Sequence, residues 1–252
     1  MTDRPIALVT GASRGIGRAI AEDLIGRGWM VAALARDADE LAALAATSPQ
    51  SVLPLVADVT DSTAMAQAMA ALTAIWRTPD LVVANAGALT AVGPTWEADP
   101  DQWWDDMEVN VRGVFTTLRD VVPSMVQRGS GRVIIMSSGM GQFPSPWTSA
   151  YGASKAAATH LASSVAAELD GTGVCAFAIS PGMVRTEMTQ WPDALLAHRP
   201  ELAALPESAF MPVSEATRLV AELAGGRFDA LSGRFIHVRD DREALLAAAG
   251  SG

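Results

Sequence analysis

Short apolar runs alternate with longer Ala- and Leu-rich segments along nearly all of the 252-residue chain. Most of the runs lack a polar residue at every second position, which is typical of strands that are covered on both faces. The pattern predicts strands at residues 6–10, 30–34, 52–56, 81–85, 133–137, 174–180 and 235–238. It predicts helices at residues 16–26, 38–47, 63–76, 101–128 (with a break near Asn110), 151–169 and 214–224.

This alternation predicts an α/β fold, a single doubly wound Rossmann domain with a mainly parallel seven-stranded sheet and helices on both faces. No stretch rich in Pro, Gly and Ser divides the chain, so we expect residues 1–252 to form one domain. Residues 183–212 interrupt the pattern with apolar side chains and four prolines. Such an excursion either covers a ligand or merely completes the core, and we favour a lid over the substrate.

Composition excludes several classes of protein. Half of the residues are hydrophobic and 18% are charged, which excludes a disordered chain. The net charge of −10 argues against a nucleic-acid partner. One cysteine cannot form an internal disulfide, and no Cys or His cluster predicts a metal site. Without a leader or an apolar run of roughly 18 residues, we expect no membrane association and a cytoplasmic location.

The only lysine and the only tyrosine lie on one predicted helix. The chain has 17 arginines, so a bias toward Arg explains why lysine is scarce but not where the single lysine stands. Tyr151 and Lys155 are four residues apart, a spacing that brings two side chains to the same helix face.

A glycine-rich turn joins the first predicted strand to the first helix, with the sequence Thr10-Gly11-Ala12-Ser13-Arg14-Gly15-Ile16-Gly17. Gly11 permits a tight turn, Gly15 lets the backbone approach a ligand, and Gly17 lets the helix pack on the sheet. Amides at the start of the helix can then face a pyrophosphate. The spacing differs from the common G-x-G-x-x-G, but its place after the first strand predicts a dinucleotide site.

The end of the second strand bears on which dinucleotide binds. A carboxylate about 20 residues past the glycines would bind the ribose of NAD(H), but this chain has Ala35 and Arg36 there. Arg36 and Arg14 together suit the 2′-phosphate of NADP(H), which we favour. Arg36 could instead be solvated or neutralised by Asp37, which leaves NAD(H) possible.

Further motifs follow in order along the chain. They are Asp58-Val59, Asn85-Ala86-Gly87, Asn110, Ser138, Tyr151-x-x-x-Lys155 and Pro181-Gly182-Met183-Val184-Arg185-Thr186. With the glycine turn, they make the chain similar to the classical short-chain dehydrogenase/reductase family over about 235 residues.

The resemblance implies roles for these residues. Asn110, Ser138, Tyr151 and Lys155 are the expected catalytic residues. The expected cofactor-binding residues are Gly11, Ser13, Arg14, Gly15, Ile16, Gly17, Arg36, Asp58, Val59, Asn85, Ala86, Gly87, Tyr151, Lys155, Pro181, Gly182, Val184 and Thr186. By the same resemblance, Asp58 binds adenine, and Asn110 helps to hold a water that returns a proton through Lys155.

The residue types suit proton transfer during reduction of a carbonyl group. The pKa of a phenol is near 10, and a neighbouring ammonium lowers that pKa. Ser138 can donate a hydrogen bond to the substrate oxygen while Tyr151 protonates it and hydride arrives from the nicotinamide. We therefore expect an NADP(H)-dependent alcohol dehydrogenase or carbonyl reductase acting on a small-molecule carbonyl or alcohol.

Blander interpretations exist for each residue alone. Ser138 could simply end a strand, Asn110 could mark a helix break, and Tyr151 could be a half-buried amphipathic side chain. The alternatives for the protein are a non-catalytic dinucleotide-binding regulator or scaffold, and an NAD-dependent alcohol dehydrogenase. A sugar-nucleotide epimerase or dehydratase shares Tyr-x-x-x-Lys but usually has a larger C-terminal domain.

Seven mostly large, apolar side chains are the candidates for a substrate pocket: Leu89, Met140, Phe143, Trp147, Met183, Met188 and Trp191. They favour a bulky hydrophobic or aromatic ketone or aldehyde, although several could pack beneath the lid instead.

The resemblance also implies assembly through helices at residues 111–128 and 151–169. Small residues along the second helix permit close approach, so we expect a homodimer at least, with a homotetramer favoured. The charged run at residues 239–243 would lie at the second interface, or it could be an exposed turn before a short surface helix.

Overall fold

Seven parallel strands form one sheet in the computed structural model, which describes residues 3–250. Their order is β3-β2-β1-β4-β5-β6-β7. The bounds are β1 (Ile6–Thr10), β2 (Met30–Ala35), β3 (Val52–Val56), β4 (Leu81–Ala84), β5 (Gly131–Met136), β6 (Val174–Ser180) and β7 (Phe235–His237). The chain reverses direction across the sheet between β1 and β4, which places a crevice at the carboxyl ends of these strands. The predicted doubly wound α/β fold is confirmed.

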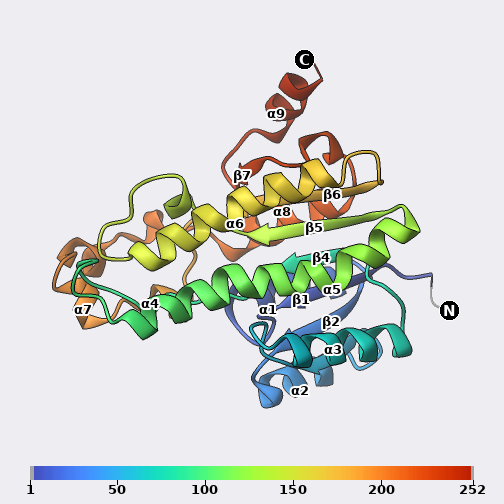
Figure 1. Cartoon of the computed structure of the whole chain (residues 1–252), viewed down its shortest axis with the longest axis horizontal. Helices are drawn as coiled ribbons and strands as arrows, with labels where there is room; N and C mark the ends of the chain where they lie inside the picture. The colour runs from blue at the N-terminus through green and yellow to red at the C-terminus, as the bar shows by residue number, and fades with distance from the viewer. Residues whose placement is uncertain (1–2, 251–252) are drawn as a thin grey trace.

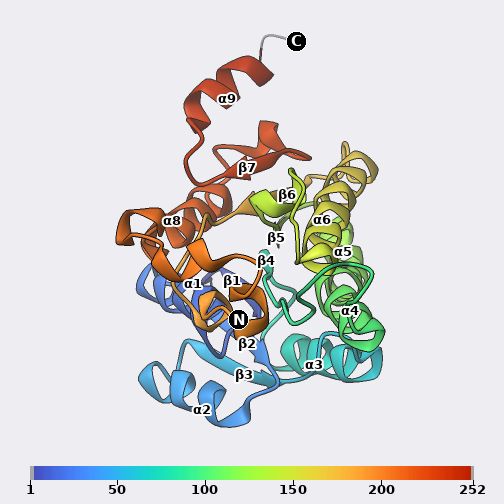
Figure 2. The ribbon, with the colours of Figure 1, turned by 90° about the vertical axis from the view of Figure 1, so that its left-hand side faces the viewer.

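Helices cover both faces of the sheet (Figures 1 and 2). One face carries α1 (Gly15–Gly26), α2 (Ala38–Thr47) and α8 (Val213–Ala224). The other carries α3 (Ser62–Ile75), α5 (Gly113–Arg128) and α6 (Ser149–Glu168), with α4 (Pro100–Met107) leading into α5. Alternate residues of each strand enter opposite apolar layers. In β1, Leu8 packs in the layer of α3 and α5, and Val9 in the layer of α1 and α8.

Aspartates begin several of these helices. Asp37 accepts a hydrogen bond from the Glu40 amide at the start of α2, and Asp61 caps α3 in the same way. Asp99 caps α4, whose first residue is Pro100. By contrast, no side chain among residues 3–250 caps α1, which begins after Arg14. The first-turn amides of α1 therefore have no side-chain oxygen to accept from them.

The break expected near Asn110 is not a break. Residues Glu108–Arg112 form a π-helical turn that continues directly from α4 into α5. One wider turn keeps the helix intact while it rotates the side chains that follow, and π turns of this kind occur frequently at functional sites.

The excursion at residues 183–212 lies at the carboxyl ends of the strands, toward the viewer in Figure 2. It contains α7 (Asp193–Leu196) and three short 3₁₀ turns. Its two ends meet where the Met211 amide donates to the Met183 carbonyl at 2.6 Å.

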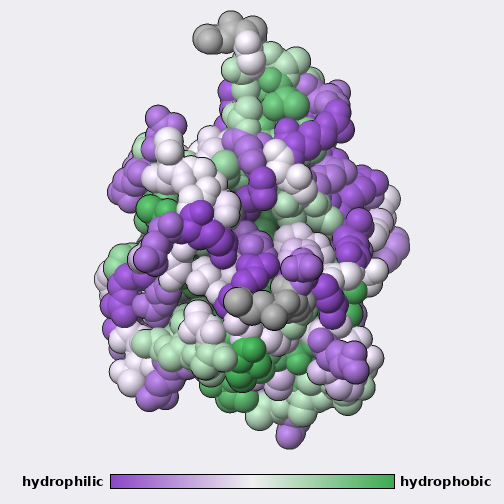
Figure 3. Space-filling view, turned by 90° about the vertical axis from the view of Figure 1, so that its right-hand side faces the viewer, coloured by the Kyte–Doolittle hydropathy of each residue, from purple (hydrophilic) through white to green (hydrophobic). Residues whose placement is uncertain are grey.

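The charged run after β7 leads into a short surface helix, α9 (Arg242–Ala249), whose residues are all half-buried or exposed. α9 lies at one end of the molecule, where Leu245, Leu246 and Ala249 pack against the apolar layer of α1 and α8 (Figures 1 and 3). None of the helices in the described part of the chain is long and apolar enough to cross a membrane.

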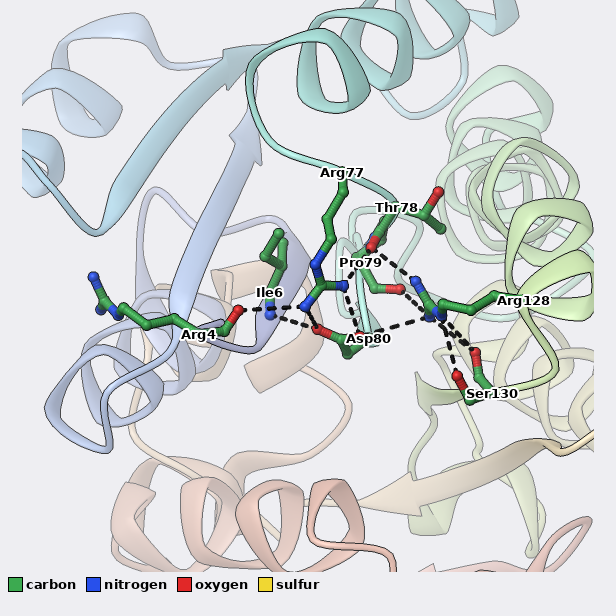
Figure 4. A network of polar contacts seen from close by, with 8 residues as sticks. All are labelled: Arg4, Ile6, Arg77, Thr78, Pro79, Asp80, Arg128 and Ser130. Carbon is green, nitrogen blue, oxygen red and sulfur yellow. Dashed lines mark hydrogen bonds and ion pairs between the residues drawn. The ribbon is translucent and has the colours of Figure 1, made fainter. Parts of the chain in front are cut away.

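A charged network connects the amino-terminal ends of β1, β4 and β5, at the end of the sheet opposite the crevice (Figure 4). Asp80 accepts from the Ile6 amide at 2.8 Å and from both terminal nitrogens of Arg77 at 2.8 Å. Arg128 lies 3.8 Å from the same carboxylate. Burial alone would raise the pKa of Asp80, but the hydrogen bonds and the two guanidinium groups hold it below the ordinary 3.8. Asp80 therefore ties the first residues of β1 to the loop that precedes β4.

We predict that Asp80→Asn lowers the free energy of unfolding by about 1–3 kcal/mol near neutral pH, because Arg77 and Arg128 lose their shared counter-charge. A carboxyl group whose pKa is depressed stabilises the protein above its unfolded pKa and loses that contribution as pH falls through its folded pKa. The difference in free energy of unfolding between the wild type and Asp80→Asn should thus be largest above about pH 5 and decrease toward pH 3. Urea unfolding at several pH values measures it, with the exposed Asp170→Asn as control. A difference that does not depend on pH would contradict this account.

Candidate active site

The turn between β1 and α1 requires glycine for two separate reasons. Gly11 and Gly15 have φ angles of +66° and +56°, in the left-handed region. Gly17 allows close packing, because a Cβ there would lie 2.2 Å from the Gly11 carbonyl oxygen and 2.4 Å from Asn85 Nδ2. A Cβ on Gly15 would meet only the side chain of Thr186 among the described residues, at 3.4 Å. Gly15 thus lies on the open side of the turn.

Buried hydrogen bonds fasten this turn to the end of β4. Thr10 Oγ1 accepts from the amides of Asn85 and Ala86 at 3.0 and 3.1 Å. Asn85 Nδ2 donates to the Thr10 carbonyl at 2.9 Å. The Asn85-Ala86-Gly87 motif therefore holds the glycine turn in place, and Thr10 is its partner. Our sequence analysis missed Thr10, although its place as the last residue of the first strand was a signal.

The turn fits the pyrophosphate of a dinucleotide. The uncapped first turn of α1 offers amide donors and the positive end of a helix dipole. Gly15 leaves room for close approach, and Thr186 lies opposite it. Ser13 and Ile16 lie in the same turn.

The two arginines expected at a 2′-phosphate both have carboxylate partners. Arg36 Nη1 lies 3.6 Å from Asp58 Oδ2, and Arg14 forms an ion pair with Glu187. Asp37 does not neutralise Arg36, because its side chain caps α2. Burial tends to raise the pKa of Asp58, but hydrogen bonds from Thr60 and the charge of Arg36 hold it below its ordinary value.

Residues after β3 and β6 complete this edge. Val59 is buried against the start of α5, where a Cβ on Gly113 would lie 2.6 Å from Val59 Cγ2, so its backbone rather than its side chain can face a ligand. Gly182 has a φ of +71°, and a Cβ there would lie 2.6 Å from Met211. Pro181 and Val184 on either side are buried.

α6 brings the sole tyrosine and the sole lysine together. Lys155 is only 3% exposed, and its Nζ donates to the carbonyl of Met136, the last residue of β5, at 2.9 Å. The same nitrogen lies 5.5 Å from the centre of the Tyr151 ring. The helix spacing thus predicted this pair correctly, and α6 presents both side chains inward.

The acid–base properties of the pair differ from the expectation. Burial raises the pKa of Tyr151 to about 12, while a hydrogen bond with Ser138 lowers it and the charge of Asp106 raises it. Burial lowers the pKa of Lys155 to about 8. The expected lowering of the Tyr151 pKa is therefore not found, because burial outweighs the hydrogen bond with Ser138. Near pH 7 the phenol remains protonated.

The two serines after β5 have separate tasks. Ser138 bonds to Tyr151, and its Oγ also accepts from the Met140 amide at 3.2 Å. Ser137 Oγ donates to the Lys155 carbonyl at 3.0 Å and lies 2.6 Å from Thr159 Oγ1. Ser137 thus fastens α6 to β5, and Ser138 is the serine beside the phenol.

Asn110 is fully buried in the π-helical turn, where it braces the loop after β4. Its Oδ1 accepts from the Ala88 amide at 2.9 Å, and its Nδ2 donates to the Ala88 carbonyl at 2.8 Å and to Ser154 Oγ at 2.9 Å. Ser154 in turn donates to the Tyr151 carbonyl at 2.8 Å. Both N–H groups of Asn110 are engaged, so its side chain positions other residues.

Asp106 is a buried carboxylate that sequence reasoning did not single out. Its oxygens accept from the Thr90 amide, the Thr90 hydroxyl and the Ala91 amide at 2.8–3.1 Å. These bonds hold the segment that follows Leu89. The feature of the sequence that could have identified Asp106 is its spacing from Asn110. Asp106 lies four residues before Asn110 and therefore on the same helix face.

Six of the seven pocket candidates follow the carboxyl ends of β4, β5 and β6. Leu89, Met140, Trp147, Met183 and Trp191 are half-buried, whereas Met188 is exposed. Trp147 has a φ of +63°, rare for a bulky residue, and its carbonyl accepts from the Gly93 amide at 2.8 Å. Its ring stacks on His198 of the excursion, with centres 5.8 Å apart.

The structure turns Phe143 outward, into a hollow that Met140 also lines. Phe143 is 74% exposed and lines a hollow of about 380 Å³ with Ala153 and Ala156. Those alanines lie on the exposed side of α6, away from Tyr151 and Lys155. The direction taken by residues 140–145 turns Phe143 outward.

Comparison with known proteins agrees with this geometry. The family described as short chain dehydrogenase matches residues 5–194. A short chain dehydrogenase of Pseudocercospora fijiensis is 34% identical, covering 96% of this chain and 82% of its own. A probable NADP-dependent dehydrogenase of Haemophilus influenzae is 36% identical over 70% of each chain. The solved structure of the KRED1-Pglu enzyme superposes with a TM-score of 0.82 at 32% identity, covering 92% of this chain and 99% of the other.

The buried lysine predicts an unusual dependence of stability on alkaline pH. Folded Lys155 loses its proton near pH 8 and unfolded lysine near 10.5, so between these values the unfolded state binds more protons. The free energy of unfolding of the wild type, relative to that of Lys155→Met, should therefore rise by roughly 2 kcal/mol between about pH 7 and pH 9.5. Denaturant unfolding of both proteins measures this difference. A constant difference across the range would show that the ammonium is not desolvated.

Proposed function

Because this chain belongs to the short chain dehydrogenase family, we propose that it is an NADP(H)-dependent oxidoreductase that reduces a ketone or aldehyde to an alcohol, or catalyses the reverse. The observation that carries the proposal is the buried couple of Tyr151 and Lys155 with Ser138 bonded to the phenol. A neutral phenol and a serine hydroxyl at one point are two donors for a single carbonyl oxygen.

The proposed chemistry divides between these side chains. Ser138 donates a hydrogen bond to the substrate oxygen and holds it within reach of Tyr151, which gives up its proton as negative charge develops there. Lys155, fixed by the Met136 carbonyl, stabilises the phenolate that remains. NADPH, when bound, supplies the hydride for the carbonyl carbon. Because burial keeps the phenol protonated at neutral pH, the acid required for reduction is the resting form of Tyr151.

The cofactor preference rests on Arg14 and Arg36. Both guanidinium groups are largely exposed beside the glycine turn and the end of β2, where a 2′-phosphate can engage them. A relative with the words NADP-dependent in its name supports this choice. NAD(H) is the alternative, since Asp58 accompanies Arg36.

For the substrate we propose a bulky hydrophobic or aromatic carbonyl compound. Leu89, Met140, Met183 and Trp191 follow β4, β5 and β6 at the end of the sheet where Ser138 also lies, and all four side chains are apolar. Residues 183–212 form the proposed lid over this edge, with His198 stacked on Trp147.

A purely regulatory or scaffold role has no support from these contacts. Burial of the Lys155 ammonium opposes folding, and it places this charge beside the phenol of Tyr151, where the proposed proton transfer uses it. Catalysis gives the reason to keep it.

We also propose a homodimer at least, with a homotetramer favoured, assembled through α5 and α6. Phe115 on α5 is 52% exposed and Val126 is also exposed, so the outer face of this helix is partly apolar. On α6, the exposed Ala153 and Ala156 permit close helix packing.

Tyr151→Phe tests the proton donor. We predict that NADPH oxidation with a panel of aryl ketones falls at least about 100-fold, because acid catalysis is worth 10²–10⁴-fold. The ring still packs, so the Kd for NADPH, measured by nicotinamide fluorescence, should change by less than about twofold. Turnover above a tenth of the wild-type rate would refute the assignment of Tyr151.

Arg36→Asp tests the cofactor preference. The change removes a cation that can bind the 2′-phosphate and adds a carboxylate that repels it while accepting from a ribose hydroxyl. We expect kcat/KM for NADPH to fall and kcat/KM for NADH to rise, shifting their ratio by at least about 10-fold. Arg234→Asp, which makes the same charge change at the exposed residue before β7, serves as the control. An unchanged ratio would mean that Arg36 points away from the cofactor.

A further inference from the structure

An ion pair joins the glycine turn to the lid. Arg14, in the turn, pairs through its terminal nitrogen with Glu187, which lies 173 residues further along the chain. Glu187 opens a 3₁₀ turn directly after Thr186, whose side chain lies over Gly15. The pair therefore crosses from one wall of the proposed cofactor site to the other.

The second proposed phosphate ligand is arranged in the same way. Arg36 faces Asp58, which also accepts from the amide and the hydroxyl of Thr60 at 2.9 and 2.8 Å. Each of the two arginines thus already has an internal anion as its partner. The partners differ in how they are held, because Asp58 accepts two hydrogen bonds from Thr60 while the Glu187 side chain is 61% exposed on the proposed lid.

We propose that Glu187 is a specificity-determining residue that competes with the 2′-phosphate of NADP(H) for Arg14. Binding of the 2′-phosphate exchanges Glu187 for phosphate oxygens and releases the first turn of the lid from the glycine turn. NAD(H), which has no 2′-phosphate, leaves the pair of Arg14 and Glu187 in place. The inference rests on the proposed function, which assigns a dinucleotide to this site.

The balance of charges allows this exchange. An ion pair between exposed side chains is weak, since water competes for both groups, and the side chains of Arg14 and Glu187 are 68% and 61% exposed. A phosphate offers a larger charge and several acceptor oxygens to a guanidinium, so it displaces the carboxylate. The competition still weakens NADP(H) binding by the free energy of the broken pair. NAD(H) carries the same pyrophosphate, so the ratio of the two dissociation constants isolates the 2′-phosphate.

Release of Glu187 leaves the base of the lid intact. The Met183 carbonyl still accepts from the Met211 amide, and Arg185 Nε still donates to both oxygens of Glu207 at 3.0 and 3.1 Å. Arg185 also lies 3.9 Å from the centre of the Phe210 ring. The exchange therefore acts on the first turn of the lid, between this base and the contact of the lid with Trp147.

The test compares the dissociation constants of NADPH and NADH, both measured by nicotinamide fluorescence at low ionic strength, in Glu187→Gln and the wild type. Glutamine keeps the shape and removes the charge. In Glu187→Gln we expect the affinity for NADPH relative to NADH to increase about two- to fivefold over the wild type, which is the range that a weak surface ion pair allows. This increase should become smaller at high salt. Glu207→Gln is the matched control, because it removes a lid carboxylate that pairs with an arginine outside the glycine turn. That variant should leave the ratio unchanged.

The same substitution in an Arg14→Gln background separates direct competition from a general effect of charge. In the Arg14→Gln protein, Glu187→Gln should no longer alter the ratio of the dissociation constants of NADPH and NADH. The inference is overturned if Glu187→Gln leaves the ratio as in the wild type, if Glu207→Gln shifts it equally, or if the shift persists without Arg14. Wild type that binds neither dinucleotide overturns the proposed function and the inference together, whereas wild type that binds NADPH with an unresponsive ratio overturns the inference alone.

Discussion

The burial of the Lys155 ammonium against the last carbonyl of β5 is the contact on which the rest of the site depends. This hydrogen bond fixes the position of α6 along β5. A second hydrogen bond, from Ser137 to the Lys155 carbonyl, fixes the same position. In that position Tyr151 forms a hydrogen bond with Ser138, and burial keeps the phenol protonated. Desolvation of an ammonium opposes folding, so the two apolar layers on the faces of the sheet must supply the stability that this arrangement costs.

A second set of buried polar contacts connects the cofactor side to the proton donor. Thr10 binds the turn after β4, Asn110 binds Ala88 in the same loop, and Ser154 links Asn110 to the Tyr151 carbonyl. The glycine turn and Tyr151 are thus positioned by two sets of hydrogen bonds that meet in the loop after β4. The π-helical turn contributes to these contacts, because it contains Asn110. The proposed lid meets the site through contacts of a different kind, namely the exposed ion pair of Arg14 with Glu187 and the ring stack on Trp147.

Much of this arrangement could be predicted from the sequence, because apolar runs define strands and a spacing of four defines a helix face. The seven-stranded, mainly parallel sheet and the placement of Tyr151 and Lys155 on one helix face are of this kind. The remaining features depend on partners that are distant in the sequence. Glu187 meets Arg14 only after the fold closes, the tyrosine pKa depends on burial, and the outward turn of Phe143 depends on a loop that has no periodicity. The π turn also could not be predicted from the sequence, since helix propensity does not distinguish a π turn from a break in the helix.

The central claim is that burial and nearby charge set the proton affinity of Tyr151, and the chain allows this to be measured directly. Tyr151 is the only tyrosine, so tyrosinate absorbance near 295 nm reports on this residue alone. Without added dinucleotide we predict that no more than about a tenth of Tyr151 is ionised at pH 11, in keeping with a pKa of about 12. Saturating NADP⁺ adds a positive nicotinamide ring to the site and should bring the midpoint below about pH 10. Ionisation near pH 10 in the absence of dinucleotide, or a midpoint that NADP⁺ does not move, would contradict the account.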